Sequence, residues 1–227
     1  MTEKSWIEEK YKDIEYNLKT IREEIAKAAA LSGRSEKDID FMAVTKTVDE
    51  MFINHAIDCG VTLIGENKVQ EMLRKKPNLH LDGVRKNLIG HLQSNKASQI
   101  VGEVDMIESV DSLKIAREIS KQALKKGIVQ DVLVEVNIGR EESKTGIMPE
   151  CVEDLLGQMG ECTGLRVCGL MAIPPVAASP DDSRPYFAAM RELFIDIGAK
   201  KYDNTSMDFL SMGMSGDFEA AIAEGAN

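Results

Sequence analysis

The sequence comprises 227 residues, of which 43% are hydrophobic and 29% are charged; this composition is typical of a globular chain with a sizeable core. Its 28 Lys and Arg against 38 Asp and Glu give a formal net charge of −10, which argues against general nucleic-acid binding because that activity requires local positive charge. The N-terminal segment lacks an apolar signal core, and no apolar run reaches membrane-spanning length. We therefore expect a cytoplasmic protein with no membrane partner.

The cysteines and histidines give little sign of metal chemistry. The cysteines are Cys59, Cys151, Cys162 and Cys168, and the histidines are His55, His80 and His91. We find no Cys-x-x-Cys pair and no histidine at zinc-ligand spacing from a cysteine. The sequence therefore predicts small buried cysteines in a reducing compartment, scattered histidines and no metal site.

The first predicted element is a helix over residues 5–31. Its apolar residues recur at alternating steps of four and three and draw one stripe, formed by Ile7, Tyr11, Ile14, Leu18, Ile21, Ile25 and Ala28. Ser32-Gly33 ends the helix. The stripe is compatible with a coiled-coil dimer, but so short a repeat favours a helix that lies against its own domain, and we expect a monomer.

From residue 41 onward, short apolar strands alternate with amphipathic helices. The predicted strands cover residues 41–46, 61–65, 87–91, 105–110, 131–137, 165–171 and 208–211. The predicted helices cover residues 50–59, 68–75, 94–101, 112–126, 149–160, 183–197 and 215–224. Strict alternation predicts parallel strands joined by helical crossovers. Since no Pro- or Gly-rich linker divides the pattern, residues 1–227 are expected to form a single domain.

Seven strands are compatible with two α/β folds. A closed (β/α)8 barrel needs an eighth strand, and the sequence stops at Asn227, just after the last predicted helix. An open doubly wound sheet also fits the count, but the turn after its first strand, residues 45–48, lacks the usual glycines. We therefore interpret the alternation as a barrel.

The carboxyl ends of parallel barrel strands face the ligand, and here they carry polar or conformationally special residues. These ends include Lys46, Gly65-Glu66-Asn67, IGHLQSNK, REESKTGI, GLMAIPP and SMGMSGD. A lysine at such a place can hold a phosphate as a cation. It can also condense with an aldehyde or ketone, because partial desolvation lowers the pKa of its ammonium. The competing interpretation is a solvated lysine just past a strand.

The segment after the seventh strand, residues 211–216, leads directly into a helix, with Ser215 as its expected N-cap. Glycines let backbone N–H groups approach a ligand, and a helix N-terminus favours an anion such as phosphate. The alternative is an ordinary strand–turn–helix connection, in which Asp217 would compete with a bound anion. Combined with Lys46, the segment indicates a ligand carrying an aldehyde and a phosphate, as pyridoxal 5′-phosphate does.

Six segments carry a resemblance to a known family. AVTKT, IGENKVQE, LIGHLQSNK, VLVEVNIGREESKTGI, GLMAIPP and LSMGMSGDFEAAIAEGA occur in this order, and together they resemble the pyridoxal-phosphate homeostasis proteins (YggS/PROSC). The resemblance implies a (β/α)8 TIM-type barrel of the alanine racemase N-terminal-domain type, with an extra N-terminal helix. It also implies that the cofactor forms a Schiff base, a lysine aldimine, with Lys46.

The resemblance further assigns residues to the cofactor site. Asn67 and Lys144 match polar positions near the cofactor pocket, and the phosphate loop corresponds to Ser211, Met212, Gly213 and Ser215. Members of the family continue into an eighth strand carrying Val-Arg-Ile-Gly, which is missing from this sequence. We therefore expect the first and seventh strands to lack a shared partner, and the cofactor to be held more weakly than with that strand.

The resemblance implies a non-enzymatic role in intracellular cofactor homeostasis, in which the protein supplies pyridoxal phosphate to pyridoxal-phosphate-dependent apoenzymes. The alternative is a racemase-type enzyme acting on amino acids, but two-sided proton transfer needs a second positioned acid or base. Tyr186 and Tyr202 lie on or after a helix and are expected to be packing residues. A Schiff-base aldolase is disfavoured because such barrels usually carry the lysine on a later strand than Lys46.

Overall fold

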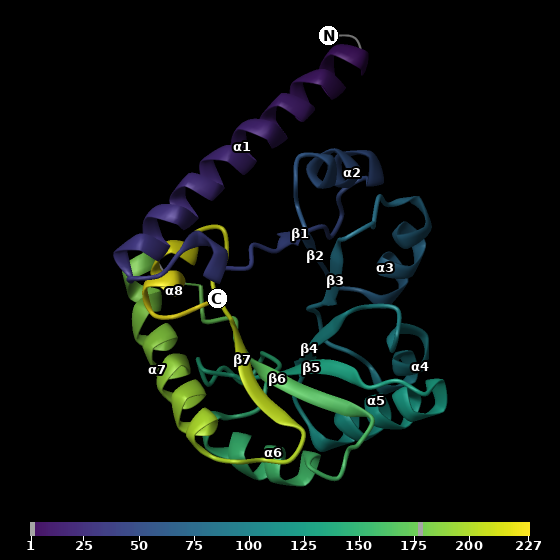
Figure 1. Cartoon of the computed structure of the whole chain (residues 1–227), viewed down its shortest axis with the longest axis vertical. Helices are drawn as coiled ribbons and strands as arrows, with labels where there is room; N and C mark the ends of the chain where they lie inside the picture. The colour runs from purple at the N-terminus through teal and green to yellow at the C-terminus, as the bar shows by residue number, and fades with distance from the viewer. Residues whose placement is uncertain (1–2, 177–178) are drawn as a thin grey trace.

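The computed structural model describes residues 3–176 and 179–227 and arranges them as a curved parallel sheet with helices around it (Figure 1). The strands are β1 (Ala43–Val44), β2 (Leu63–Glu66), β3 (Arg85–Leu88), β4 (Met106–Val110), β5 (Gln130–Glu135), β6 (Leu165–Met171) and β7 (Thr205–Ser211). The spatial order of the strands follows the chain order, and each neighbouring pair is parallel. This arrangement confirms the predicted alternation of strands and helical crossovers.

The helices follow the prediction, with differences at their ends. They are α1 (Glu3–Leu31), α2 (Glu50–Asp58), α3 (Val69–Lys75), α4 (Ala97–Ile100), α5 (Leu113–Lys126), α6 (Val152–Met159), α7 (Pro180–Ala199) and α8 (Phe218–Ala223). The segments predicted at 94–101 and 149–160 each begin with a 3₁₀ turn, Ser94–Lys96 and Pro149–Cys151. Helix α7 begins before the predicted residue 183, because Asp182 accepts hydrogen bonds from the backbone and hydroxyl of Ser179.

A contact across the sheet shows how strongly it curves. The hydroxyl of Ser211 on β7 donates to Oε2 of Glu108 on β4, at 2.7 Å. Because β5 and β6 lie between these strands, a flat sheet would hold β4 and β7 about 14 Å apart. The sheet is therefore rolled so that the inner faces of distant strands meet, as in a barrel.

The central strands β4, β5 and β6 are buried on both faces. On β5, Val132 and Val134 belong to the large cluster that the sheet forms with its helices. Between them, Leu133 points to the opposite face and packs in a smaller cluster with Cys168 and Met171 of β6. Burial on two faces explains why the sequence shows continuous apolar runs in place of strict alternation.

The observed strand ends correct several predicted ones. Only Ala43 and Val44 pair with β2, so β1 is shorter than the predicted 41–46. Strand β3 begins two residues before the predicted residue 87, because ion pairs accommodate its two charged residues. Arg85 pairs with Asp40 at 2.6 Å, and Lys86 pairs with Asp105 at 2.8 Å. Strand β7 begins three residues before the predicted residue 208.

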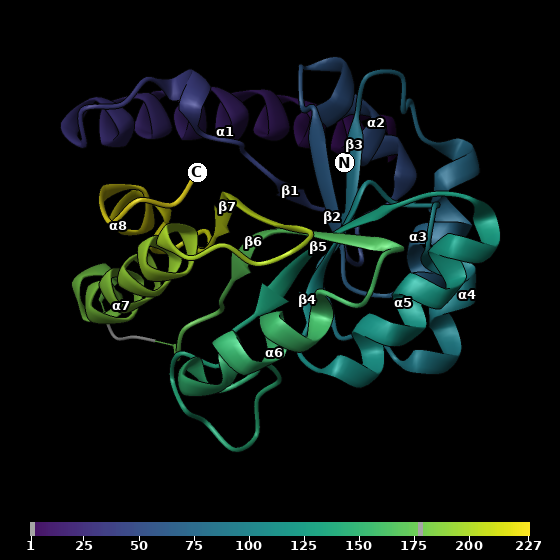
Figure 2. The same cartoon turned by 60° about the horizontal axis from the view of Figure 1, so that its bottom comes forward.

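Helix α1 lies against its own chain. Leu18 packs in a cluster with Val61 beside α2, and Ile25 packs in a cluster with Ile222 of α8. Arg34, just beyond α1, donates to the backbone carbonyl of Ile222. Figure 2 shows α1 running from the side of α8 to the side of α2. This arrangement agrees with the intramolecular alternative for the apolar stripe.

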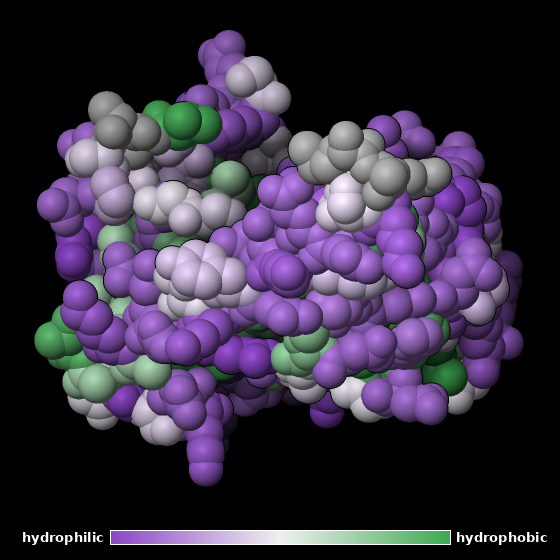
Figure 3. Space-filling view, turned by 90° about the horizontal axis from the view of Figure 1, so that it is seen from above, coloured by the Kyte–Doolittle hydropathy of each residue, from purple (hydrophilic) through white to green (hydrophobic). Residues whose placement is uncertain are grey.

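The molecular surface matches the charged composition. The face seen in Figure 3 is mainly hydrophilic, with hydrophobic side chains in small scattered groups. No helix in the described parts of the chain combines the length and apolarity that crossing a membrane requires. Cys162 and Cys168 are buried as predicted, whereas Cys59 is half-buried and Cys151 is exposed. The prediction that all four cysteines are buried was therefore wrong.

Candidate functional site

Lys46 lies in a turn after β1, and a buried cation holds the backbone of that turn. Lys75 of α3 is 1% exposed. Its Nζ donates at 2.7 Å to each of three acceptors, the carbonyl of Thr45, Oε1 of Glu66 and Oε1 of Glu71. The ammonium therefore uses all three of its N–H donors. We call Lys75, Glu66 and Glu71 the Lys75 clamp.

The clamp also holds the residue that follows Lys46. Thr47 has a φ of 62°, a left-handed conformation that costs a β-branched residue about 1–2 kcal/mol. Its N–H donates to Oε1 of Glu71 at 2.7 Å. The hydrogen bond from Lys75, and next that from Thr47, lower the pKa of Glu71. Lys46 thus lies between two residues whose backbones are fixed by buried or half-buried charges.

The side chain of Lys46 itself is exposed, and no hydrogen bond or ion pair joins it to another residue in the described part of the chain. The partial desolvation expected from the sequence is therefore not observed. What the structure provides is a fixed backbone on both sides of an accessible amine.

Asn67 lies beside the clamp. It follows Glu66, whose Oε2 accepts a hydrogen bond from the Asn67 backbone N–H at 3.3 Å. The backbone of Gly90, after β3, passes so close that a Cβ there would lie 2.3 Å from the carbonyl oxygen of Asn67. Residue 90 must therefore be glycine. The Ser109 hydroxyl secures this crossing by donating to the Gly90 carbonyl at 2.7 Å.

The end of β5 carries a buried carboxyl group with an unpaired oxygen. Oε1 of Glu135 accepts a hydrogen bond from the Thr145 hydroxyl at 2.5 Å, but its buried Oε2 has no hydrogen-bond partner in the described segments 3–176 and 179–227. Burial raises the pKa of Glu135, and the Thr145 hydrogen bond opposes the rise. Nearby, His91 Nδ1 lies 3.6 Å from a carboxylate oxygen of Asp111. An unpaired buried acceptor at the ligand-facing end of a barrel is the kind of group that a ligand can satisfy.

Lys144 is engaged with neighbouring loops. Its Nζ donates to the carbonyl of Pro174 at 3.1 Å and forms an ion pair with Oε2 of Glu141 at 2.6 Å. These contacts tie the loop after β5 to the segment after β6. Lys144 therefore lies at the carboxyl ends of the strands, as the resemblance implies, but its amine is already occupied.

The segment after β7 packs against the barrel core and α8. Ser211 directs its hydroxyl to Glu108 in the barrel interior, and Met212 packs against the large core cluster. Gly213 has a φ of 92°, and a Cβ there would lie 2.6 Å from Cβ of Ala221. Only glycine fits this approach between the segment and α8.

The predicted N-cap of the last helix was wrong. Ser215 is exposed in a turn, and the N-cap of α8 is Asp217. The Asp217 carboxylate accepts hydrogen bonds from the Met214 N–H at 2.7 Å and from the Ser183 hydroxyl at 3.0 Å. The Asp217 side chain makes these contacts and does not cap α8, and a local capping rule contains no information about Ser183. The backbone donor of Met214 is consequently occupied.

The structure therefore brings the predicted site residues to the same end of the sheet in separate groups. Lys46 and Asn67 share the Lys75 clamp, Lys144 joins the loops after β5 and β6, and Ser211 is linked to β4. Across residues 3–176 and 179–227, no hydrogen bond or ion pair joins these groups directly. Sequence reasoning missed Lys75. One signal existed, because Lys75 follows Val69 and Met72 at steps of three and so lies on the face that α3 buries.

One further expectation was wrong. His55 Nε2 lies 3.8 Å from the sulfur of Cys59, whereas the sequence analysis found no histidine at zinc-ligand spacing from a cysteine. The two residues are four positions apart on α2, a spacing that brings side chains together on a helix.

The fold and the position of the site define a class. Residues 14–226 match the family described as alanine racemase, N-terminal domain. A solved alanine racemase from Clostridium difficile 630 has a TM-score of 0.64 at 15% identity, covering 87% of this chain and 50% of that chain. The protein is an α/β TIM-type barrel of the alanine racemase N-terminal-domain type, preceded by a helix.

Closer relatives define the family. A pyridoxal phosphate homeostasis protein from Aquifex aeolicus (strain VF5) is 43% identical over 209 residues, which are 92% of this chain and 91% of the relative. The structure of PipY from Synechococcus elongatus PCC7942 with PLP bound has a TM-score of 0.78 and 30% identity, covering 89% of this chain and 95% of that chain. This chain belongs to the pyridoxal phosphate homeostasis protein family, which confirms the resemblance found in its motifs.

Replacing Lys75 should be far more damaging than replacing its neighbour. Lys75→Met leaves Glu66 buried without a cation and should lower the free energy of unfolding by about 3–5 kcal/mol. Lys76→Met is the matched control, because Lys76 pairs with Glu103 where both side chains are about one-third exposed; it should cost at most about 1 kcal/mol. Urea denaturation measures both. Equal losses would contradict the importance of the buried clamp.

Glu108 should make the protein less stable as the pH rises. Burial raises the pKa of Glu108 from its usual 4.5, opposed by hydrogen bonds from Ser211 and Asn87. Between the unfolded pKa of about 4.5 and the raised folded pKa, Glu108 therefore holds its proton more in the folded protein than in the unfolded chain. Its stabilising contribution is complete below the unfolded pKa and is lost as pH rises through the folded pKa. Glu108→Gln should flatten this fall in unfolding experiments across pH.

Glu103 supplies a control, because its pKa is shifted in the opposite direction to that of Glu108. The hydrogen bond from Lys76 lowers the pKa of Glu103, so its contribution is present above the unfolded pKa and is lost as pH falls. Glu103→Gln should not flatten the fall in stability at rising pH. If Glu108→Gln left the pH profile unchanged, Glu108 would not be the buried titrating group.

Proposed function

We propose that the protein binds pyridoxal 5′-phosphate at the carboxyl ends of its strands, holds it through Lys46 and supplies it to other enzymes. Bound there, the cofactor contributes an aldehyde that reacts with an amine and a phosphate that accepts hydrogen bonds. The observation that carries the proposal is Lys46, an accessible amine that has no partner among the described residues and lies in a turn fixed on both sides. Its chain belongs to a family whose relatives are named for pyridoxal phosphate homeostasis.

The residues at this end of the barrel fit such a ligand. Lys46 offers the amine, and Glu135 offers a buried acceptor that lacks a partner in the part of the chain that the structure describes. In the segment after β7, the exposed hydroxyl of Ser215 is available for a phosphate, whereas Ser211 and the Met214 N–H are engaged. Asn67 and Lys144 lie at the same end of the barrel. Met212 packs on the core cluster and Gly213 packs against α8, and both hold the segment after β7 in place.

A carrier suits these residues better than a racemase does. Racemisation needs acid–base groups on two sides of the reacting carbon. The Tyr202 hydroxyl donates to Glu153 of α6 at 3.2 Å and its side chain packs against the large core cluster, as expected for a packing residue; Tyr186 lies half-buried on α7. Turnover of amino acids by the purified protein would favour the racemase-type alternative.

The proposal also covers the domain organisation, the location and the partners of the protein. We take residues 1–227 to be one cofactor-binding domain that acts as a cytoplasmic monomer. Its partners are pyridoxal phosphate and the apoenzymes that receive it, and nucleic acid is not among them. The net charge of −10 supports the last point.

Borohydride reduction of the loaded protein should label the peptide that contains Lys46. Lys46→Ala and Lys46→Arg should both lose the label, since a guanidinium stays protonated and does not react as an amine. Lys68→Ala, which removes another exposed lysine nearby, should keep it. Mass spectrometry of the digested protein locates the label. A label that persisted at full yield in Lys46→Arg would assign the covalent link to another residue.

Lys144 should affect exchange of the cofactor and leave the primary link intact. Lys144→Ala breaks the contacts to Glu141 and Pro174, which loosens two loops at the ligand-facing end. We expect altered rates of loading and of transfer to an apoenzyme, with the Lys46 label unchanged. Lys201→Ala, at an exposed position beyond α7, is the control. Identical rates in wild type and Lys144→Ala would remove Lys144 from the site.

A further inference from the structure

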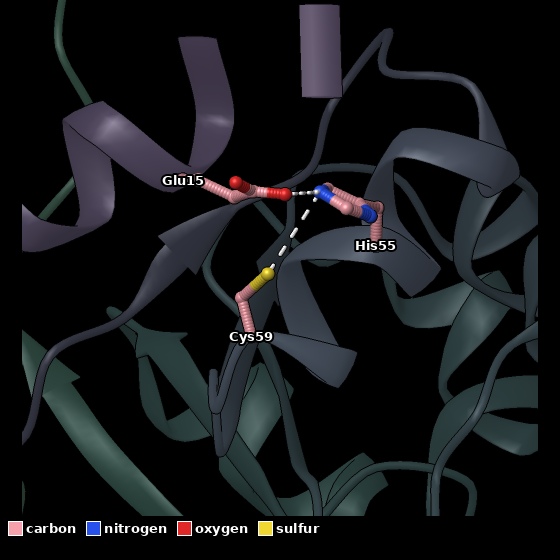
Figure 4. Close-up of side chains that lie close together, drawn as sticks. All are labelled: Glu15, His55 and Cys59. Carbon is pink, nitrogen blue, oxygen red and sulfur yellow. Dashed lines mark hydrogen bonds and ion pairs between the residues drawn. The ribbon is translucent and has the colours of Figure 1, made fainter. Parts of the chain in front are cut away.

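Three different metal-binding side chains meet between α1 and α2. His55 Nε2 lies 3.1 Å from Oε1 of Glu15 and 3.8 Å from Sγ of Cys59. The three donor atoms all lie within 4.8 Å of one another. Figure 4 shows the side chains converging, with Glu15 coming from α1 and His55 from α2. The group lies outside the set of residues that form the candidate cofactor site.

The two helices build this arrangement through one repeated spacing. His55 and Cys59 are four residues apart and share a face of α2, and Cys59 is the C-cap of that helix. On α1, Tyr11 and Glu15 are likewise four residues apart. The Tyr11 ring stacks on the His55 ring, with centroids 4.0 Å apart and planes 13° apart. This stacking fixes the plane in which Nε2 points toward Glu15.

The separations match those of a small tetrahedral ion. Zinc binds nitrogen and oxygen at about 2.0–2.2 Å and sulfur at about 2.3 Å, so neighbouring ligand atoms lie about 3.3–3.6 Å apart. The two separations from His55 Nε2, 3.1 and 3.8 Å, bracket these values. The third, between the donor atoms of Glu15 and Cys59, is within 4.8 Å, so the side chains would rotate to receive an ion. One carboxylate, one imidazole and one thiolate form a ligand set that suits zinc, with the fourth position left for water.

The local charges also favour a cation. The negative charges of Glu15 and Asp58 lie near Cys59. The cation of Arg22 opposes their attraction for an ion, because it donates to the Cys59 carbonyl at 2.9 Å. An entering ion would displace the thiol proton and neutralise the carboxylate. Without an ion, His55 is hydrogen-bonded to Glu15 beside the Cys59 thiol.

We propose that Glu15, His55 and Cys59 form a binding site for one divalent zinc-type ion, which joins α1 to α2. The role is structural, since the ion would cross-link the first helix to the helix that follows the Lys46 turn. The site is independent of the proposed cofactor function, because Lys46 is not one of its ligands.

Cobalt(II) and zinc titrations of the chelator-treated full-length protein test this proposal. Wild type should bind one ion per chain, and cobalt should give the charge-transfer absorption of a thiolate ligand. His55→Gln and Cys59→Ser should weaken binding by more than about 100-fold, since removing a direct ligand should exceed the roughly 10–100-fold cost of losing an outer partner. Glu15→Gln changes a mainly exposed residue, so its loss of affinity would not reflect misfolding.

Matched controls come from the same chain. Cys151→Ser removes an exposed cysteine, and His80→Gln removes an exposed histidine; both should keep the cobalt spectrum and the stoichiometry. Lys46→Arg should also bind the ion normally, which separates this proposal from the cofactor site. Zinc should raise the melting temperature of wild type but not of Cys59→Ser. A wild-type protein without a thiolate–cobalt band, or unchanged zinc affinity in Cys59→Ser, would overturn the proposal.

Discussion

The buried ammonium of Lys75 is the interaction on which the geometry of the candidate site depends. Strand β1 has only two paired residues, so sheet pairing alone holds little of the turn that carries Lys46. The clamp supplies the missing constraint through the Thr45 carbonyl and, by way of Glu71, through the Thr47 N–H. Because each charge in this network is costly to bury without its partners, the network is stable only when it is complete.

A second polar network fixes the opposite side of the barrel. Glu108 accepts hydrogen bonds from Asn87 of β3 and from Ser211 of β7, and thereby ties three strands together inside the barrel. The segment after β7 consequently starts from a fixed strand end, as Lys46 does. Reactive groups placed on such rigid supports lose little freedom when a ligand binds.

The sequence predicted the seven strands because strands buried on both faces leave apolar runs between amphipathic helices. It failed where tertiary contacts override local rules. Ion pairs admit Arg85 to β3, and α8 begins after Asp217, which is hydrogen-bonded to Ser183 of α7, and not after Ser215. Lys46 was predicted to be the cofactor lysine because it follows a strand and lies in a family motif. Lys75 was missed because a lysine is normally taken to be a surface residue, and only three-dimensional packing reveals its buried acceptors.

Helix α1 gives the barrel a mechanical property. It is about 43 Å long if straight, from its 29 residues, and it touches both α2, which follows β1, and α8, which follows β7. The helix therefore connects the two edges of the sheet, β1 and β7, through the helices that follow them (Figure 2). Moving those ends apart would require the apolar stripe of α1 to slide off one of its two supports. The stiffness of the curved sheet thus depends in part on α1, a helix that lies outside the alternation of strands and crossover helices.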